Sequence, residues 1–430
     1  MTQTLNIGVA GLGTVGAGTV KLLQENALMI ANRCGANIQV VAVSARDKTK
    51  DRGIDTSEMI WCDHPVEIAS LDHVQVVVEL MGGSEGAARE LVELALKNGK
   101  HVVTANKALI AHHGVALAAM AEKNNVALMF EAAVAGGIPI IDALRNGLSA
   151  NRFSCVAGIL NGTGNYILTT MSAQGRDFDD VLLEAQKLGY AEADPSFDVD
   201  GIDTAHKLCI LTTLAYGTAL DMGGVSTEGI RSITRQDMVN AKELGYAIKL
   251  LGITEQTDSG IRQRVHPCMV PDDAPIGMID GAFNAVHLEG NAVGCILLQG
   301  AGAGAGPTAS SVVADLLQIA RGSYGAPLMV KSDALSKAAS AKMDDLISSY
   351  YLRLMVRDEK GVLSAITSLL NQADISVQSL IQHDHTPDVP AQIVLTTYDT
   401  TEANMRKALQ AIASLDSVIE QPQMIRIESL

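Results

Sequence analysis

The stretch 190–214 holds the side chains best suited to chemistry. Asp203 and Lys207 stand four residues apart, so on a helix they share one face. A lysine that enters an apolar segment beside a carboxylate is a candidate acid/base group, because desolvation lowers its pKa toward the working range. An acidic helix start with an ordinary ion pair is the structural alternative. The same stretch carries four further carboxylates: Glu192, Asp194, Asp198 and Asp200.

Two other side chains bear on this chemistry. The imidazole of His206 titrates near neutrality when unperturbed, but a histidine beside an apolar run is more often a core residue, and Lys207 has the better-placed carboxylate. Lys107 ends the motif TANK at 104–107, directly after an apolar strand pattern. Strand ends of this kind form the ligand crevice in an open parallel sheet, whereas the helix dipole disfavours a surface lysine at a helix start. Lys107 is therefore a candidate to bind a charged substrate or cofactor group.

A glycine motif near the N-terminus predicts a dinucleotide site. A strand pattern at 5–10 leads into GLGTVG at 11–16, and a helical pattern follows at 17–24. This is G-x-G-x-x-G between a strand and a helix, the context that gives the motif its meaning. Gly11 permits the tight turn, Gly13 lets a pyrophosphate approach the backbone, and Gly16 allows close helix–strand packing. Amides at the helix start then face the phosphates.

The end of the second strand bears on the choice of cofactor. An NAD site expects Asp or Glu near that point to hold the ribose hydroxyls, but this chain has Arg46. Arg46 can pair with a 2′-phosphate, so NADP is favoured, while Asp47 next to it keeps NAD possible. An ordinary solvated loop arginine is the alternative interpretation.

The elements that must position these residues alternate between strand and helix. Strand patterns recur at 38–43, 74–80, 100–103 and 126–130, and a helical pattern fills 86–97. Aromatic residues make up only 3% of the chain, so its cores must be aliphatic. Alternation of this kind predicts an α/β domain with a Rossmann-type parallel sheet.

Three glycine-rich stretches follow the predicted sheet. The first, 131–139, has a lone acidic residue, Glu131, and can expose backbone carbonyls suited to a hard cation, or else form a simple turn. NGTGNY at 161–166 is predicted as a polar loop that contacts a ligand, or as a tight connection. The third, 299–308, precedes a helical pattern at 309–320 and can approach a ligand or another chain segment closely, or act as a hinge.

The C-terminal part has a separate pattern. After a connector at 321–347, strand and helix patterns alternate in the order βαββαβ, which is the ferredoxin-like arrangement. The first turn, 357–363, has a carboxylate and a glycine just before a helix. That combination suits an amino-acid zwitterion, which needs partners of both signs.

Composition and charge exclude several classes of function. The chain has 430 residues, 47% of them hydrophobic and 19% charged, enough for two or three domains with sizeable cores. A formal charge of −16 argues against nucleic acid and against an anionic membrane surface. No apolar run reaches the about 18 residues of a membrane span. Six scattered cysteines without a CxxC pair fit reduced thiols, so we expect a cytoplasmic protein.

Over essentially its full length the chain resembles the homoserine dehydrogenases that carry a C-terminal ACT domain. The resemblance rests on GLGTVG at 11–16, TANK at 104–107, EAAVAGGIP at 131–139, NGTGNYIL at 161–168 and the stretch 192–207. It implies interconversion of L-homoserine and L-aspartate 4-semialdehyde in threonine and methionine biosynthesis, with hydride exchanged with NADP or NAD. It also implies four parts: an NAD(P)-binding Rossmann domain at 1–135, an α+β catalytic and dimerisation domain at 136–320, a linker at 321–347 and a ferredoxin-like ACT domain at 348–430.

The resemblance also implies roles for individual residues. Lys207 looks like the proton donor and acceptor, Asp203 would organise it, and Lys107 would stand near the reacting oxygen and the nicotinamide. Glu192 and Asp198 would hold the amino end of the substrate. Cofactor contacts would come from Gly11, Gly13, Thr14, Val15, Gly16, Arg46, Thr104, Lys107 and Gly306. The family's site for a monovalent cation such as sodium maps onto Glu131, Val134, Gly136 and Ile138, with backbone carbonyls as ligands for all but Glu131.

Regulation and assembly are implied in the same way. Feedback inhibition by L-threonine would act through the ACT domain, with Asp358, Gly361 and Asn371 as candidate contacts. ACT domains of this type usually have proline just before the glycine, whereas this chain has Lys360. A homodimer or homotetramer is implied, because ACT sheets commonly pair.

Two competing interpretations stay open at this point. A phosphoglycerate dehydrogenase also carries an ACT domain, but its dinucleotide motif lies mid-chain, whereas the motif here begins at Gly11. A non-catalytic amino-acid sensor would bind threonine without turnover. Against a sensor, the Asp203–Lys207 pair and Lys107 have no obvious use without chemistry.

Overall fold

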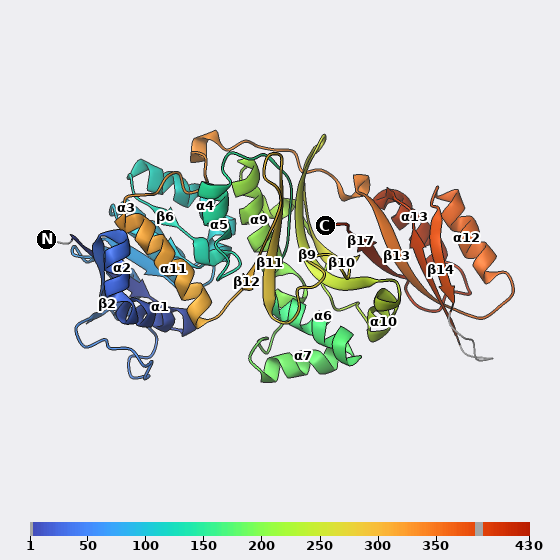
Figure 1. Cartoon of the computed structure of the whole chain (residues 1–430), viewed down its shortest axis with the longest axis horizontal. Helices are drawn as coiled ribbons and strands as arrows, with labels where there is room; N and C mark the ends of the chain where they lie inside the picture. The colour runs from blue at the N-terminus through green and yellow to red at the C-terminus, as the bar shows by residue number, and fades with distance from the viewer. Residues whose placement is uncertain (1–2, 383–389) are drawn as a thin grey trace.

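The molecule is elongated, with an N-terminal α/β layer at one end and a small C-terminal module at the other (Figure 1). A computed structural model describes residues 3–382 and 390–430. A large mixed sheet occupies the middle of the molecule, between these two ends. The expected α/β, α+β and ferredoxin-like regions are therefore all present.

The N-terminal layer is built on six parallel strands in the order β3-β2-β1-β4-β5-β6. This is the order of a dinucleotide-binding sheet, which places its crevice at the carboxyl ends of the central strands. The central strands are almost wholly buried because helices cover both faces of the sheet. The strands are β1 (Gln3–Ala10), β2 (Ala36–Ser44), β3 (Ile60–Trp61), β4 (Val76–Glu79), β5 (His101–Thr104) and β6 (Leu128–Met129).

Helices from distant parts of the chain share one face of this sheet. α1 (Thr14–Glu25), α2 (Ala27–Cys34) and α11 (Ala305–Ala320) pack into one core, whereas α3 (Ala87–Lys97) and α4 (Lys107–Lys123) cover the opposite face. α11 thus returns to the nucleotide-binding layer after strands β7 to β12 of the central sheet have been built (Figure 1). Its small residues allow the close approach: a side chain on Gly18 of α1 would meet the carbonyl oxygen of Ala305 at 2.7 Å.

The central sheet positions the helix that carries Asp203 and Lys207. Its catalytic part runs β12-β11-β7-β9-β10, with β8 on β10. α9 is buried over most of its length against β7, β9 and β10. The strands are β7 (Phe153–Ile159), β8 (Val225–Thr227), β9 (Tyr246–Thr257), β10 (Gly260–Pro271), β11 (Phe283–Gly290) and β12 (Gly294–Ala301), and the helices are α6 (Gly162–Gln174), α7 (Phe178–Lys187), α8 (Ser196–Val199), α9 (Ile202–Tyr216) and α10 (Arg235–Glu243).

Two of the glycine-rich stretches lie at helix starts, and the first of them was predicted as a loop. NGTGNY opens α6, and the side chain of Asn161 caps that helix by accepting from the amide of Gly164 at 2.7 Å. The stretch 299–308 ends β12 and begins α11 at Ala305, so only 302–304 connect the two elements. Glycine frequency misled the loop prediction at 161–166, because the cap at Asn161 starts a helix there. The close approach predicted for 299–308 is present within the chain, since a side chain on Gly302 would lie 2.2 Å from the side chain of Asn284.

The C-terminal module has the predicted βαββαβ order. Its antiparallel strands run β17-β13-β15-β14, with two helices packed on the sheet. The module continues the central sheet, because β17 pairs in parallel with β10 at Arg426 and Ile427. The elements are β13 (Ile347–Val356), α12 (Val362–Gln372), β14 (Val377–Gln382), β15 (Ala391–Thr397), β16 (Thr400–Thr401), α13 (Glu402–Ala413) and β17 (Gln423–Ile427).

Short helical turns complete the described chain. They are η1 (Pro65–Ser70), η2 (Glu131–Ala133), α5 (Ile140–Asp142), the π-turn η3 (Ala143–Gly147), η4 (Met222–Gly224), η5 (Ser332–Ala334) and η6 (Met343–Asp345). Among the described helices, none combines the length and the hydropathy needed to cross a membrane. All six cysteines are free thiols.

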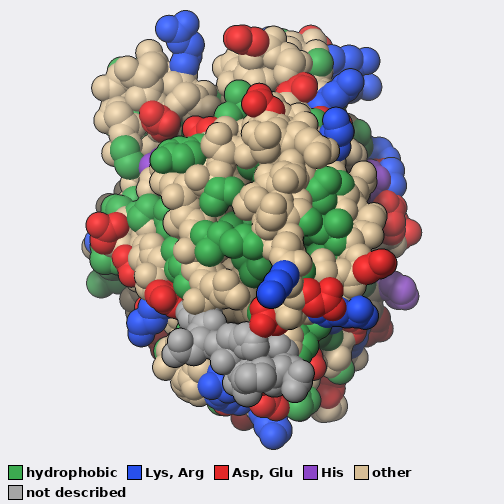
Figure 2. All heavy atoms as spheres, turned by 90° about the vertical axis from the view of Figure 1, so that its right-hand side faces the viewer, with side chains coloured by type: hydrophobic (Ala, Val, Ile, Leu, Met, Phe, Trp, Pro, Cys, Tyr) green, Lys and Arg blue, Asp and Glu red, His purple; other side chains and the backbone are tan. Residues whose placement is uncertain are grey.

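The end of the molecule that carries the C-terminal module presents an apolar surface. Seen from that end, hydrophobic side chains gather across the middle of the face, and acidic and basic side chains lie around its margin (Figure 2). Within the module, Leu363 of α12 is 37% exposed and Leu380 of β14 is 40% exposed.

Candidate active site

Asp203 lies between two lysines from different domains. Lys207 Nζ is 2.7 Å from Asp203 Oδ2, and Lys107 Nζ is 2.8 Å from Asp203 Oδ1. Lys207 lies in the second turn of α9, whereas Lys107 is the first residue of α4, a helix packed on the parallel sheet. The predicted contact at i,i+4 is therefore present. The contact to Lys107 joins the nucleotide-binding layer to the central sheet at the candidate catalytic group.

The start of α9 is held by the backbone around it. Gly201 adopts φ +82°, and a side chain there would crowd Val265 and Thr227 at 3.0–3.1 Å. This glycine ends the acidic stretch and lets α9 begin one residue before Asp203. Lys207 Nζ also donates to the carbonyl oxygen of Leu160 at 2.6 Å, directly after β7. The lysine is thus fixed from both the helix and the sheet.

Burial sets the charge state of this cluster. Removal from water lowers the pKa of Lys207 below its ordinary value, and the carboxylate of Asp203 opposes only part of that change. Burial alone would raise the pKa of Asp203, but the charges of Lys207 and Lys107 outweigh it and hold the pKa below its usual range. Asp203 therefore stays ionised, and Lys207 is the member of the pair whose charged form burial disfavours.

Asn161 ties a second carboxylate to the cluster. Its side-chain nitrogen donates to Asp198 Oδ1 at 2.7 Å and to Asp203 Oδ2 at 2.8 Å. Asp198 lies on the short helix α8, and burial raises the pKa of its carboxyl. The NGTG motif was a signal for this residue, but the sequence did not show that Asn161 would bridge two acids.

His206 takes part in an aromatic contact beside the lysine pair. Its ring packs against Phe197 at 5.4 Å and His112 at 5.2 Å between centroids. Burial, with a smaller contribution from His112, lowers the pKa of His206 to about 4. A neutral imidazole in an aromatic contact fits the packing role over the acid/base role. The sequence missed Phe197, whose ring centre lies 5.4 Å from Lys107 Nζ.

The strand ends beside Lys107 form a hydrogen-bonded edge. Thr104 Oγ1 donates to Glu79 Oε2 at 2.6 Å and accepts from the amide of Asn106. Asn106 caps α4, since its side chain accepts from the amide of Leu109. Sequence reasoning named Thr104 but missed Glu79, a fully buried carboxylate that ends the apolar run of β4.

The glycine motif has the shape that a pyrophosphate needs. Gly11 adopts φ +97° and donates its amide to Ser44, and a side chain on Gly16 would lie 1.9 Å from the carbonyl oxygen of Gly11. Gly13 has open space around it and begins α1 without a side-chain cap. Thr14 and Val15 form the first turn, so their amides are available to an anion. Gly306, in the first turn of α11, also has open space where a side chain would lie.

In the loop after β2, the two residues that could contact the cofactor ribose, Arg46 and Asp47, differ in whether their side chains are already engaged within the chain. Arg46 is exposed, whereas the carboxylate of Asp47 accepts from the amide and the hydroxyl of Thr49 at 2.8 and 2.7 Å. Sequence reasoning missed Arg52, whose Nε donates to the carbonyl oxygen of Leu12 inside the glycine motif at 2.9 Å. Arg52 therefore ties this loop to the turn that would hold the phosphates.

The stretch 131–139 surrounds a pair of buried acids. Both carboxylate oxygens of Glu131 accept backbone amides, from Ile141 at 2.9 Å and Asp142 at 2.6 Å. Asp315 of α11 accepts the amide of Glu131 through Oδ2, and its Oδ1 is buried without a partner. Burial and Asp315 raise the pKa of Glu131 to about 8, and burial raises that of Asp315 to about 7. The sequence missed Asp315, although a charged residue in the apolar pattern of α11 was a signal.

The carbonyls predicted to bind the cation are partly engaged within the chain. The Gly136 carbonyl accepts from Ser311 Oγ at 2.6 Å, and the Ile138 carbonyl accepts from the amide of Ile140 at 2.8 Å. Val134 is buried beside them. Ala135 holds a left-handed φ of +55°, which is strained for a residue with a side chain and turns the carbonyls of this loop.

Glu192 and the three predicted effector contacts lie at the surface. Glu192 is exposed between α7 and α8. Asp358 and Gly361 precede α12, where Gly361 adopts φ +92°, whereas Asn371 is in its last turn. Ten residues of helix separate Gly361 from Asn371, or about 15 Å. The structure therefore does not bring Asn371 together with the other two contacts within one chain.

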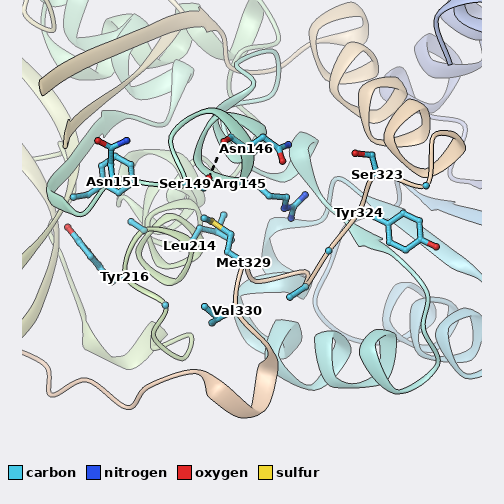
Figure 3. Close-up of a pocket in the computed structure, with 16 residues that line it drawn as sticks. Arg145, Asn146, Ser149, Asn151, Leu214, Tyr216, Ser323, Tyr324, Met329 and Val330 are labelled. Atoms are coloured by element: carbon cyan, nitrogen blue, oxygen red, sulfur yellow. Dashed lines mark hydrogen bonds between the residues drawn. The ribbon is translucent and has the colours of Figure 1, made fainter. Parts of the chain in front are cut away.

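A cavity of about 670 Å³ lies at the opposite end of α9 from Lys207 (Figure 3). Arg145 and Met329 point into it, and Leu214 and Tyr216 line it from the end of the helix. None of the predicted site residues lines this cavity. It lies beside the connector 322–330 and is distinct from the lysine cluster.

One further cluster has metal-ligand residue types. His266, Cys268 and Glu428 place ligand atoms within 4.8 Å of one another. Arg264 already donates to both carboxylate oxygens of Glu428, at 3.1 and 3.2 Å. Burial holds the pKa of His266 well below and that of Cys268 well above its ordinary value, so both are neutral. This cluster therefore fits a domain contact better than a metal site.

Comparisons with known proteins agree with this geometry. A family model described as "Homoserine dehydrogenase, NAD binding domain" matches 11–131, the homoserine dehydrogenase model matches 139–317, and the ACT domain model matches 350–417. A homoserine dehydrogenase of Neisseria gonorrhoeae is 46% identical, with 100% of this chain and 99% of the relative covered.

Solved structures show the same fold. The crystal structure of a homoserine dehydrogenase from Thiobacillus denitrificans has a TM-score of 0.94 and 44% identity, over 99% of each chain. A hyperthermophilic archaeal homoserine dehydrogenase in complex with NADPH has a TM-score of 0.65 and 27% identity, over 76% of this chain and 100% of that one.

Proposed function

The chain belongs to the homoserine dehydrogenase family, NAD(P)-dependent oxidoreductases that act on a hydroxyl group, and we propose that Lys207 exchanges the proton of that hydroxyl. The observation that carries this proposal is the buried contact of Lys207 with Asp203 and Leu160. A bound nicotinamide supplies or accepts the hydride. The substrates are L-homoserine in one direction and L-aspartate 4-semialdehyde in the other, in threonine and methionine biosynthesis.

Lys207 has one hydrogen-bonding position left for substrate. An ammonium has three donors, and two of those of Lys207 are directed to Leu160 and Asp203. The third can donate to a carbonyl oxygen during reduction. During oxidation the neutral amine takes the proton of the alcohol. Asp203 keeps the lysine oriented and stabilises its charged form, while Lys107, with a side chain 34% exposed, stands at the entrance and steadies negative charge on the same oxygen.

Substrate recognition would use the acidic side of the cluster. Asp198 is held by Asn161 at 2.7 Å, so its carboxylate has a fixed orientation toward an ammonium group. Glu192 would add a second, solvent-facing carboxylate. Two acids for the ammonium group and two lysines for the reacting oxygen would match a zwitterionic amino acid that also carries a hydroxyl.

Cofactor recognition would follow the glycine motif and the strand ends. Gly11, Gly13, Thr14, Val15 and Gly16 would hold the pyrophosphate at the start of α1, with Thr104 and Gly306 beside the crevice. NADP is favoured over NAD, because Arg46 is exposed at the ribose position while the carboxylate of Asp47 is engaged by Thr49.

A monovalent cation such as sodium fits the loop around Glu131. The unpartnered oxygen of Asp315 and the raised pKa of Glu131 support this site, because a bound cation would stabilise the ionised forms of two acids that burial disfavours. Glu131 with the backbone of Val134, Gly136 and Ile138 would hold the ion, which supplies compensating charge between α5 and α11. Sodium would then raise the melting temperature of the wild type but not of Glu131→Gln, with choline chloride as the ionic-strength control.

The ACT domain would bind L-threonine as a feedback inhibitor. Asp358 and Gly361 would contact the amino acid at the start of α12, with Lys360 in place of the usual proline. Asn371 would contribute from a second copy of the chain, because it lies at the other end of the helix. A homodimer or homotetramer follows from this arrangement, and the apolar end face in Figure 2 supports it. The six free cysteines support a cytoplasmic location.

The test follows reduced nicotinamide by absorbance in purified protein. L-homoserine is supplied with NADP⁺ and then NAD⁺, with and without L-threonine. We expect turnover with both cofactors, a lower KM for NADP⁺, and inhibition by threonine that Asp358→Asn removes. Cofactor and threonine binding without turnover would overturn the catalytic assignment in favour of a sensor. Turnover without a threonine effect would overturn only the regulatory proposal.

A further inference from the structure

Arg426 of β17 joins the ACT domain to the catalytic part. Its guanidinium is almost fully buried, with a side chain 1% exposed. It donates to both oxygens of Glu402 within the ACT domain, at 2.9 and 2.5 Å, and to both oxygens of Glu228 after β8, at 3.0 and 2.8 Å. A guanidinium bound by two carboxylates in this bidentate way fixes the orientation of each.

The residues after Glu228 form hydrogen bonds and an ion pair with the short helix α8 and the residue that follows it. The amide of Ile230 donates to the carbonyl oxygen of Val199 at 2.9 Å. Gly229 packs so closely that a side chain there would lie 2.4 Å from the same oxygen. Arg231 donates to both carboxylate oxygens of Asp200, at 2.5 and 3.1 Å, and to the hydroxyl of Ser196 at 3.1 Å. The segment 228–231 thus holds both ends of α8.

α8 in turn carries Asp198, which Asn161 joins to Asp203. A continuous series of bidentate ion pairs and backbone hydrogen bonds therefore runs from β17 to the candidate substrate site. We infer that Arg426 is a positioning residue, which fixes Glu228 and through the segment 228–231 holds Asp198 in place for the amino group of the substrate. This inference rests on the proposed role of Asp198.

A second buried ion pair between the same domains provides the internal control. Arg353 of β13 donates to both oxygens of Asp237, at 2.7 and 3.2 Å, with side chains 11% and 0% exposed. Asp237 belongs to the capping box of α10, and its described contacts do not include α8. Loss of Arg353 weakens domain docking without touching the path to Asp198.

The experiment compares full-length variants in the oxidation of L-homoserine by NADP⁺. We expect Arg426→Gln and Glu228→Gln to raise the KM for homoserine about fivefold, the size of one lost hydrogen bond, with kcat little changed. Arg426→Lys should fall between wild type and Arg426→Gln. Asp198→Asn should raise the same KM about tenfold or more, because it removes a charged partner. Arg353→Gln should lower the melting temperature and leave the KM unchanged.

Hydrogen exchange provides a readout that does not depend on catalysis. Amides of 196–201 should exchange faster in Arg426→Gln and Glu228→Gln than in Arg353→Gln. The side chain of Glu228 is 41% exposed, so Glu228→Gln should fold even if Arg426→Gln does not. In that case Glu228→Gln alone tests whether the path to Asp198 affects the KM. An equal rise in KM and exchange for Arg353→Gln would overturn the inference, and so would wild-type values in Glu228→Gln. Unchanged KM in Asp198→Asn would remove the substrate role and the inference with it, whereas absence of wild-type turnover would overturn the proposed function itself.

Discussion

The active-site cluster and the domain contact are opposite arrangements of buried charge. At the active site one carboxylate, Asp203, lies between two lysines. At the domain contact one guanidinium, Arg426, lies between two glutamates. Both central groups are buried, and both bring together residues from different parts of the chain. They differ in whether the buried cation can release a proton.

The choice of cation explains the difference. A lysine changes its pKa readily when buried, whereas an arginine stays charged in proteins. The pKa of Lys207 is lowered by burial, while the two carboxylates outweigh burial and raise the pKa of Arg426 above its ordinary value. The first arrangement can move a proton, and the second can only hold geometry. The comparison therefore predicts effects on kcat at the Asp203 cluster, and effects on stability and on the KM for homoserine at Arg426.

The largest expected effect comes from Lys207→Ala. Loss of the proton-exchanging group should lower kcat by about 10²- to 10⁴-fold, the usual contribution of general acid–base catalysis. NADP⁺ binding should survive, because Asp203 keeps Lys107 as its partner. The matched control is Lys249→Met, a buried lysine that donates to the Ile279 carbonyl at 2.6 Å and should affect stability only. Full activity in Lys207→Ala would transfer the role to Lys107 or His206.

The next effect concerns stability. Arg426→Met leaves Glu402 and Glu228 without their shared cation, and breaking a buried pair in this way lowers the free energy of unfolding by about 3–5 kcal/mol. Lys207→Met should lower it by less, because Asp203 retains Lys107 as a charged partner. Denaturant unfolding of both variants measures the difference. Equal losses would show that the two clusters do not divide catalysis and stability between them.

A smaller effect is expected in the pH profile. Homoserine oxidation needs neutral Lys207, so kcat/KM should rise with pH through a pKa below the ordinary lysine value of about 10.4. Reduction of the semialdehyde needs the protonated form and should fall over the same range. The carboxylate of Asp203 raises the pKa of Lys207. Asp203→Asn should therefore move the rise of the oxidation rate and the fall of the reduction rate to lower pH. His206→Asn should leave them in place; a shift there would point to the imidazole.

The smallest effect is expected at the edge of the domain contact. Arg406 also donates to Glu402, at 2.9 Å, but its side chain is 48% exposed. An exposed pair contributes little, so Arg406→Ala should change the free energy of unfolding by less than about 1 kcal/mol. A loss as large as that of Arg426→Met would mean that charge count, rather than burial, governs this contact.

Local patterns in the sequence determined much of the fold. The glycine motif, the Asp203–Lys207 spacing and the βαββαβ order of the C-terminal module are each encoded within a short stretch, so they could be predicted. Periodicity and capping residues act over a few positions, and the family motifs lie in the same short stretches. The stretch 161–166 was mispredicted because its glycines suggested a loop, whereas the side chain of Asn161 caps α6 and starts the helix there.

Only the tertiary structure decided which distant groups meet. It brought Lys107 to Asp203, placed Asn161 between two acids, returned α11 to the first sheet beside Glu131, and paired β17 with β10. A residue type at one position carries no information about its partner a hundred positions away. Those partners are selected by the topology of the sheets and by the need to pair every buried charge. The sequence therefore determined the chemical groups of this enzyme, and the fold determined their contacts.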